Sequence, residues 1–316
     1  MKSTVIVVLL VLLYVGLLPA ADVIDFVPRH SRQVLQINLA DIAGMEMTRD
    51  DMIRSVFRQA GFEKGKNDAD EFISLIDKIL IVTPVLTESE TFVFVKTKVK
   101  ENEFCRSLHE KTGIRQISVK NGTRTEYQII LPETSKFPGI ARRQRIFVFT
   151  FLTENIAVFA KDSLINYWKY KNLGLSKQKR KYLNIPQALA AGFVEPEPAF
   201  MQENPFLPPF QEAVYSLAAG PAGSLCIRAW AECQDETIAN QTQMFLQQYI
   251  MVGGMLLNQA APELMQEWIN SVKVSRTGTK VFIRGDFSRD FINRLTTASE
   301  KLAEEQQMRE RDLKKR

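Results

Sequence analysis

The sequence is poor in histidine and cysteine, the residues that most often build catalytic and metal sites. It contains two histidines, His30 and His109, and three cysteines in 316 residues. Neither histidine has a metal-binding neighbour four positions on, and no C-x-x-C pair occurs. The glycine-rich phosphate loops, the G-x-S-x-G nucleophile elbow and the calcium-loop pattern are also missing. The sequence therefore predicts no catalytic residue, no metal ion and no cofactor.

The odd number of cysteines leaves at least one thiol without a disulfide partner. Cys226 and Cys233 are predicted to share one strand, which would separate their Cα atoms by about 23 Å. That distance is far beyond the reach of a disulfide. We therefore expect buried free thiols, including Cys105.

Long apolar runs are scarce, and the clearest stands near the N-terminus. Lys2 precedes the apolar segment Val5–Leu18, and small residues follow it at Ala20 and Ala21. This pattern predicts a signal peptide over residues 1–21 and an exported chain, either periplasmic or extracellular. Leu18 is bulky where cleavage prefers a small side chain, so retention as an uncleaved N-terminal anchor stays open.

The net charge of +5 is concentrated in one stretch, and no basic face interleaved with aromatics recurs elsewhere. Nucleic acid is therefore not an expected partner. A solvated connector is the favoured interpretation of the stretch, because blocks of like charge usually stay exposed. The alternative is contact with an anionic membrane surface. The candidate residues for that contact are Lys169, Lys171, Lys177, Lys179, Arg180 and Lys181.

Prolines cluster at residues 185–210, which predicts a Pro/Phe-rich connector that is not one continuous regular element. Four aromatic rings in this segment exceed what a loose linker needs. They are candidate contacts with a partner protein: Phe193, Phe200, Phe206 and Phe210.

The remaining patterns predict an α+β fold of two similar halves, each with antiparallel strands and hairpins packed against helices, joined by the Pro-rich segment. Strand, helix and hairpin follow in that order on both sides of the connector. The first domain is expected at 22–184, the second at 211–302, and a charged tail at 303–316. Since residue identity between the halves is close to nil, an ancient duplication and a chance similarity of plan both remain open.

A methionine cluster accompanies the long helix expected after Asp235, and Gly253-Gly254 lies inside that helix. The glycines predict a close helix contact or a break near Val252. The methionines are interpreted as core residues, with an adaptable apolar groove as the alternative. They are Met244, Met251, Met255 and Met265.

These observations favour an exported, non-enzymatic binding or scaffold protein whose partner is a component of the cell envelope or extracellular space. The second hypothesis is a membrane-anchored surface protein that uses a retained N-terminal helix and the basic stretch. The third is an enzyme with an unrecognised site, because catalytic groups that converge in space can be scattered in sequence.

Overall fold

A computed structural model describes residues 22–43, 71–72, 74–87, 90–112, 116–121, 124–131, 145–203, 208–295 and 297–298. The predicted leader at 1–21 and the tail at 303–316 lie outside these residues. So does the segment 48–60, for which Thr48 and Asp51 predict a helix start that resembles a capping box. The described elements, in chain order, are η1 (Val23–Phe26), β1 (Gln33–Asn38), α2 (Leu39–Ala43), β2 (Ile76–Thr83), β3 (Phe92–Thr97), α5 (Glu101–Thr112), β4 (Gln116–Asn121), β5 (Arg124–Leu131), β6 (Arg145–Thr153), β7 (Ile156–Lys161), η2 (Tyr167–Lys169), α6 (Lys177–Leu183), β8 (Ala188–Val194), α7 (Pro198–Glu203), β9 (Phe210–Ala219), η3 (Pro221–Gly223), β10 (Leu225–Cys233), α8 (Glu236–Ala260), α9 (Pro262–Ser271), β11 (Val272–Thr277) and β12 (Lys280–Phe287).

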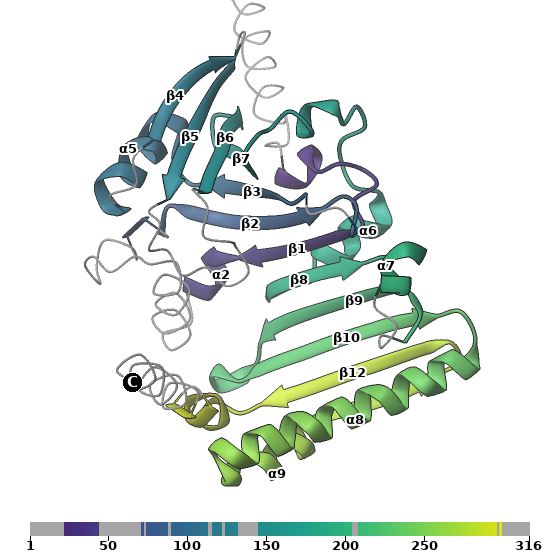
Figure 1. The fold of residues 1–316 in the computed structure, drawn as a ribbon. Helices are drawn as coiled ribbons and strands as arrows, with labels where there is room; N and C mark the ends of the chain where they lie inside the picture. The colour runs from purple at the N-terminus through teal and green to yellow at the C-terminus, as the bar shows by residue number, and fades with distance from the viewer. Residues whose placement is uncertain are drawn as a thin grey trace, which may run out of the picture.

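The strands form one 12-stranded antiparallel sheet with the order β11-β12-β10-β9-β8-β1-β2-β3-β7-β6-β5-β4 (Figure 1). The α+β class and the antiparallel hairpins expected from the sequence are therefore confirmed. Each half begins at the middle of the sheet, with β1 beside β8, and adds its next two strands outward. A helical segment then follows the third strand, and a hairpin closes each outer edge. The first half carries one additional hairpin, β6–β7, between β3 and β5.

Local signals placed several of these elements correctly. The Oδ1 atom of Asp235 accepts a hydrogen bond from the backbone N–H of Ile238 at 2.8 Å and so caps α8. Pro262 begins α9, where its missing N–H costs nothing. The hairpin expected around Gly278 joins β11 and β12, and the positive φ of 58° at this residue suits glycine.

The segment 185–210 is not one regular element, as expected, but it does not lie across the surface as a connector, because residues 188–194 form the central strand β8. Pro186 and Pro196 flank this strand and leave its interior free of proline, so its N–H groups can pair with both neighbours. A Cβ at Gly192 would lie 2.5 Å from the ring of Tyr215 and 2.6 Å from the carbonyl of Val34, so only glycine fits there. The sheet thus continues across the expected boundary.

The sequence of residues 68–77 predicts a helix, but β2 already begins at Ile76. The segment that follows alternates between the two faces of the sheet, as in its neighbour β3. Pairing with β1 and β3 therefore decides the conformation of Ile76 and Asp77.

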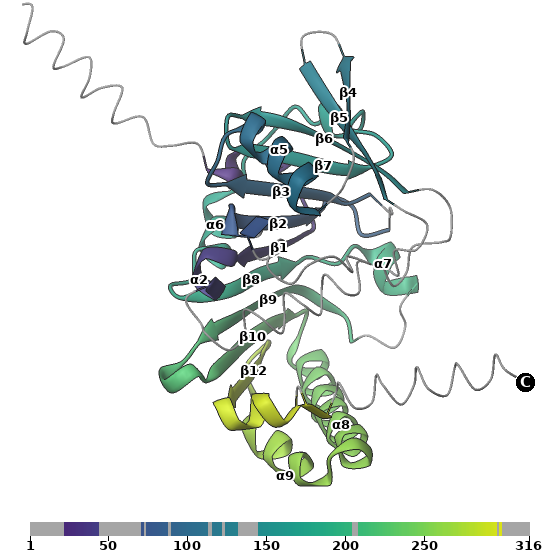
Figure 2. The ribbon, with the colours of Figure 1, turned by 90° about the vertical axis from the view of Figure 1, so that its left-hand side faces the viewer.

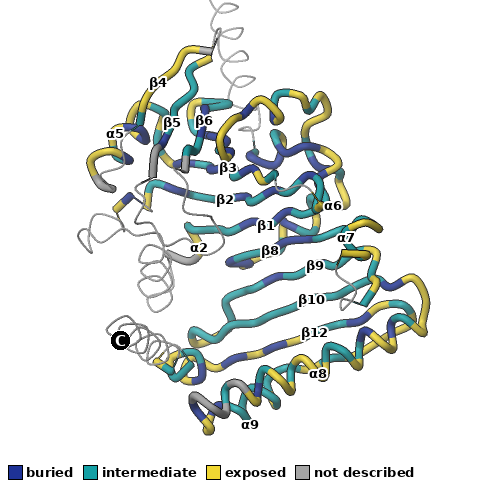
Figure 3. The backbone as a smooth tube through the Cα atoms, in the orientation of Figure 1, coloured by how far each residue is buried: buried dark blue, intermediate teal, exposed yellow. Residues whose placement is uncertain are grey.

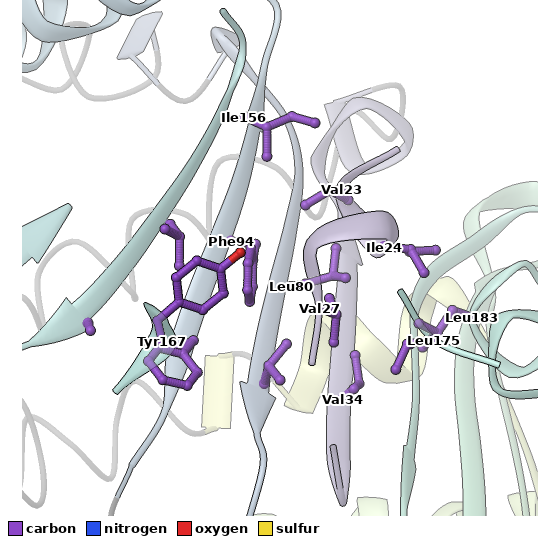
Figure 4. Packing of buried hydrophobic residues seen from close by; sticks show 14 of the residues in the cluster. Val23, Ile24, Val27, Val34, Leu80, Phe94, Ile156, Tyr167, Leu175 and Leu183 are labelled. Carbon is purple, nitrogen blue, oxygen red and sulfur yellow. The ribbon is translucent and has the colours of Figure 1, made fainter. Parts of the chain in front are cut away.

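The first half of the sheet is covered on both faces. Alternate residues of β3 enter different layers: Phe92 and Phe94 pack with η1, η2 and α6, whereas Val95 packs with α5. Figure 4 shows the first layer, in which Tyr167 lies against Phe94, with ring centroids 5.6 Å apart. The packing on both faces holds the ends of β1 and η2 in place, and the loops before β1 and after η2 extend from these ends.

In the second half, α8 and α9 cover one face of the sheet, while Tyr182 of α6 packs against Phe193 and Trp230 on the other. Leu264 of α9 packs against Phe287 and Phe291, while Ala239 of α8 packs against Val281. Both helices lie at the end of the sheet opposite α5 and the β4–β5 hairpin (Figure 2). This placement gives α8 one side toward the strands and another toward solvent.

Candidate functional site

The helix α8 carries a group of large apolar side chains, each of which is more than half exposed. This group, called the apolar strip below, consists of Met244, Tyr249, Met251, Val252 and Met255. Its methionines recur at seven- and four-residue intervals, which places them on the same side of a helix. Figure 3 shows exposed positions recurring along the length of α8. The interpretation of these three methionines as core residues is therefore wrong.

The opposite side of α8 is anchored to the sheet and to α9. Ala239 and Thr242 are buried, and the Thr242 hydroxyl lies 3.5 Å from the Cys233 sulfur. The indole N–H of Trp268 donates to the carbonyl oxygen of Ile250 at 3.0 Å. These contacts hold the helix in one rotation about its axis, so the apolar strip stays on the solvent side.

Close packing between α8 and α9 depends on the glycine pair inside α8. A Cβ on Gly254 would lie 3.2 Å from Cγ1 of Ile269, and one on Gly253 would lie 3.3 Å from Nε1 of Trp268. The helix nevertheless continues to Ala260. The expected close helix contact is therefore confirmed, and a break near Val252 is not observed.

The near absence of charge on α8 also bears on its role, as the apolar strip does. Glu236, at the first position, is the only charged residue in the sequence of this 25-residue helix. The exposed positions that are not apolar include Asn240, Gln241, Gln247 and Gln248. A cluster of exposed apolar groups without interspersed charge marks a contact surface more specifically than scattered surface residues do.

The aromatic residues predicted to contact a partner do not form one surface. Phe193 is fully buried in β8, between the strands β1 and β9, and this prediction is wrong. Phe210 is half-buried against the cluster of Cys233, Ala239 and Val281. Phe200 is half-buried on α7, and Phe206 lies outside the described residues.

The predicted basic stretch is likewise divided by the fold. Lys177 and Lys181 on α6 are exposed. The Lys179 ammonium instead lies 2.8 Å from Oε2 of Glu195, and the Arg180 guanidinium 2.7 Å from Oδ1 of Asp25. Lys169 is the last residue of η2 and Lys171 follows it, and both share a pocket with Lys179. The six residues therefore do not present a single basic face.

The most perturbed carboxylates have structural explanations. Burial raises the pKa of Glu212, which accepts a hydrogen bond from the Tyr182 hydroxyl at 3.0 Å. Hydrogen bonds from Arg284 and Arg228 hold the pKa of Asp286 well below its usual range.

Within the described part of the chain, no three His, Cys, Asp or Glu side chains are grouped to hold a metal ion. The described helices also include none with the length and apolar character needed to span a membrane.

Comparison with known proteins identifies a similar fold and no family. No family model matches the chain, and no curated protein matches it. The solved structure of TP0453 in crystal form III superposes with a TM-score of 0.53 at 10% identity, covering 89% of this chain and 99% of that one. Crystal form I of TP0453 gives a TM-score of 0.49 at 10% identity, covering 90% of this chain and 98% of that one. At this identity the likeness concerns the fold alone.

Proposed function

We propose that this chain is an exported, non-enzymatic binding protein that holds another protein on the apolar strip of α8. The observation that carries the proposal is the exposure of five large apolar side chains on a helix whose other side is anchored to the sheet. Exposing such a cluster to water is unfavourable by about 25 cal/mol per Å². A partner that covers the strip removes this cost, so the strip has the character of a binding surface.

The chemistry of the strip favours a protein partner over a lipid surface. Helices that lie on membranes usually flank their apolar side with Lys and Arg, and the sequence of α8 contains neither. The centres of protein interfaces are depleted in charge and enriched in Tyr and Met. Methionine side chains are flexible and polarisable, which lets them fit an irregular apolar partner.

The location of the protein follows from its predicted leader and is part of the same proposal. Export through the segment 1–21 would place α8 in the periplasm or extracellular space. The expected partner is then a protein of the cell envelope or of the extracellular space. The non-enzymatic role is supported by the sequence, which contains no catalytic motif.

The proposal is tested by placing a photocrosslinking side chain at position 251 of the full chain in the cells that produce it. We expect a covalent adduct with another protein at 251 and none at position 106. Arg106 is the matched control, because it is an exposed position on the helix α5, outside the apolar strip. Met255→Glu should remove the adduct at 251, since one charge in the centre of an apolar contact opposes binding.

Three results would overturn this function. Equal adducts at 251 and 106 would show random encounter. An adduct of twice the chain's own mass, together with a dimer in light scattering, would show that the strip binds a second copy. Flotation with vesicles of neutral phosphatidylcholine that Met251→Glu abolishes would show that the strip binds lipid.

A further inference from the structure

A basic pocket lies at the opposite half of the molecule from α8, where the loop before β1 meets the segment after η2. Its volume is about 520 Å³, within the range of small-molecule sites. The basic side chains that line it come from three separate parts of the sequence: Arg29, His30, Arg32, Lys169, Lys171 and Lys179.

We propose that this basic pocket binds a phosphate-bearing ligand. Five side chains that carry positive charge face two carboxylates, Glu195 and Glu197, which leaves a net charge of +3 with His30 neutral. Such an excess of positive charge suits an anionic ligand. Arginine and lysine side chains are the usual partners of phosphate oxygens in proteins.

The two carboxylates already form ion pairs and a hydrogen bond with neighbouring groups of the protein. Glu195 lies 2.8 Å from the Lys179 ammonium and 3.6 Å from the Arg32 guanidinium. Glu197 lies 3.6 Å from Arg32 and accepts a hydrogen bond from the backbone N–H of Leu86 at 3.1 Å. Lys179 and Arg32 thus neutralise the acidic wall, and the charges that remain for a ligand belong to Arg29, Lys169 and Lys171.

The frame of the pocket is preorganised. The backbone N–H of Arg29 donates to the carbonyl of Asn172 at 3.0 Å, and Pro28 forms a β-bridge with Leu173. The hydroxyl of the fully buried Ser31 donates to the carbonyl of Pro28 at 2.7 Å. These bonds fix Arg29 and Lys171 on adjacent backbone segments, which lowers the entropic cost of bringing two cations to one anion.

The remaining walls are less polar. Pro28, Pro84, Val85 and Tyr170 contribute them. Such walls can contact the uncharged part of an organic phosphate, which inorganic phosphate lacks. The pocket therefore favours a phosphomonoester or phosphodiester over the free ion. The same chemistry occurs in a soluble phosphate ester and in a phospholipid headgroup.

Calorimetric titration of the full chain with glycerol 3-phosphate and with inorganic phosphate tests the proposal. A parallel arm measures flotation with phosphatidylcholine vesicles that contain phosphatidylglycerol. The test variant is Arg29→Gln with Lys171→Gln. The matched control is Lys177→Gln with Lys181→Gln, which also removes two positive charges from exposed sites, but outside the pocket.

We expect the pocket variant to weaken binding roughly tenfold or more, because charge-assisted contacts are lost. The control variant should weaken it by less than about twofold, since its charges are exposed, lie outside the pocket lining and are screened by salt. Binding of the soluble ester identifies a soluble ligand, whereas binding of vesicles alone, with the same dependence on variants, identifies a headgroup. Equal losses in both variants would show nonspecific attraction, and binding in neither arm would remove the site; either result overturns the proposal.

Discussion

The helices α5 and α8 occupy corresponding places in the two halves, and they differ in the surface that they show to solvent. Each follows the third strand of its half and packs one side on the sheet. The exposed side of α5 carries charged and polar residues, among them Glu103, Arg106 and Glu110. The exposed side of α8 carries the apolar strip. The fold therefore does not require an apolar outer surface at this position, and the strip is a property of α8 alone.

The largest expected effect concerns the inner side of α5. Phe104 is 2% exposed and contacts the rings of Phe72, Phe149 and Phe151. Phe104→Ala should lower the free energy of unfolding by about 3–5 kcal/mol, through lost burial and a cavity. Arg106→Ala, at an exposed position on the same helix, should change it by less than about 0.5 kcal/mol. Urea denaturation measures both; similar losses would mean that the inner and outer sides are assigned wrongly.

The next effect concerns the contact that fixes the rotation of α8. Gly254→Val places methyl groups against Ile269 and Trp268, where even a Cβ is tight, and should cost about 1–3 kcal/mol. Gln248→Val places the same side chain at an exposed position of α8 and should lower the free energy of unfolding by no more than about 0.5 kcal/mol. Thermal unfolding compares them. An unchanged stability of the glycine variant would show that α9 does not press on α8 there.

The smallest expected effect is a difference in alkylation rate between the thiols of the two halves. Cys105 of α5 is buried, as is Cys233 at the end of β10, whereas Cys226 is half-exposed; all three are free thiols, as expected. Iodoacetamide at neutral pH should therefore modify Cys226 first, and mass spectrometry of the digested chain identifies the order. Modification of Cys105 before Cys226 would contradict the burial of α5's inner side.

The stability of the protein is expected to depend on pH through the buried thiol of Cys105. Burial raises the pKa of the Cys105 thiol from 9.0 to about 11. The folded state thus favours the neutral thiol, and its contribution to stability is complete below pH 9 and is lost as the pH rises toward 11. A Cys105→Ala variant should show a smaller decline of unfolding free energy across this interval. An identical decline would assign the loss to other groups.

Much of the local structure could be predicted because its signals are short-range. Asp235 marks the start of α8, and Pro262 that of α9. By contrast, β8 was missed because the surrounding prolines dominate its composition, while its conformation is set by pairing with β1 and β9. The exposed methionines were assigned to the core because helical spacing shows which residues share a side, without showing which side meets the sheet.

The amino-acid sequence by itself determined the α+β class, the repeated order of strand, helix and hairpin, and the absence of familiar catalytic motifs, since these depend on residue types and on neighbours along the chain. Only the tertiary structure decided that Phe193 is buried, that the apolar strip faces solvent, and that Arg29 meets Lys171 in one pocket. The physical reason is that burial and charge proximity depend on contacts between segments far apart in sequence, such as the bond from Arg29 to Asn172.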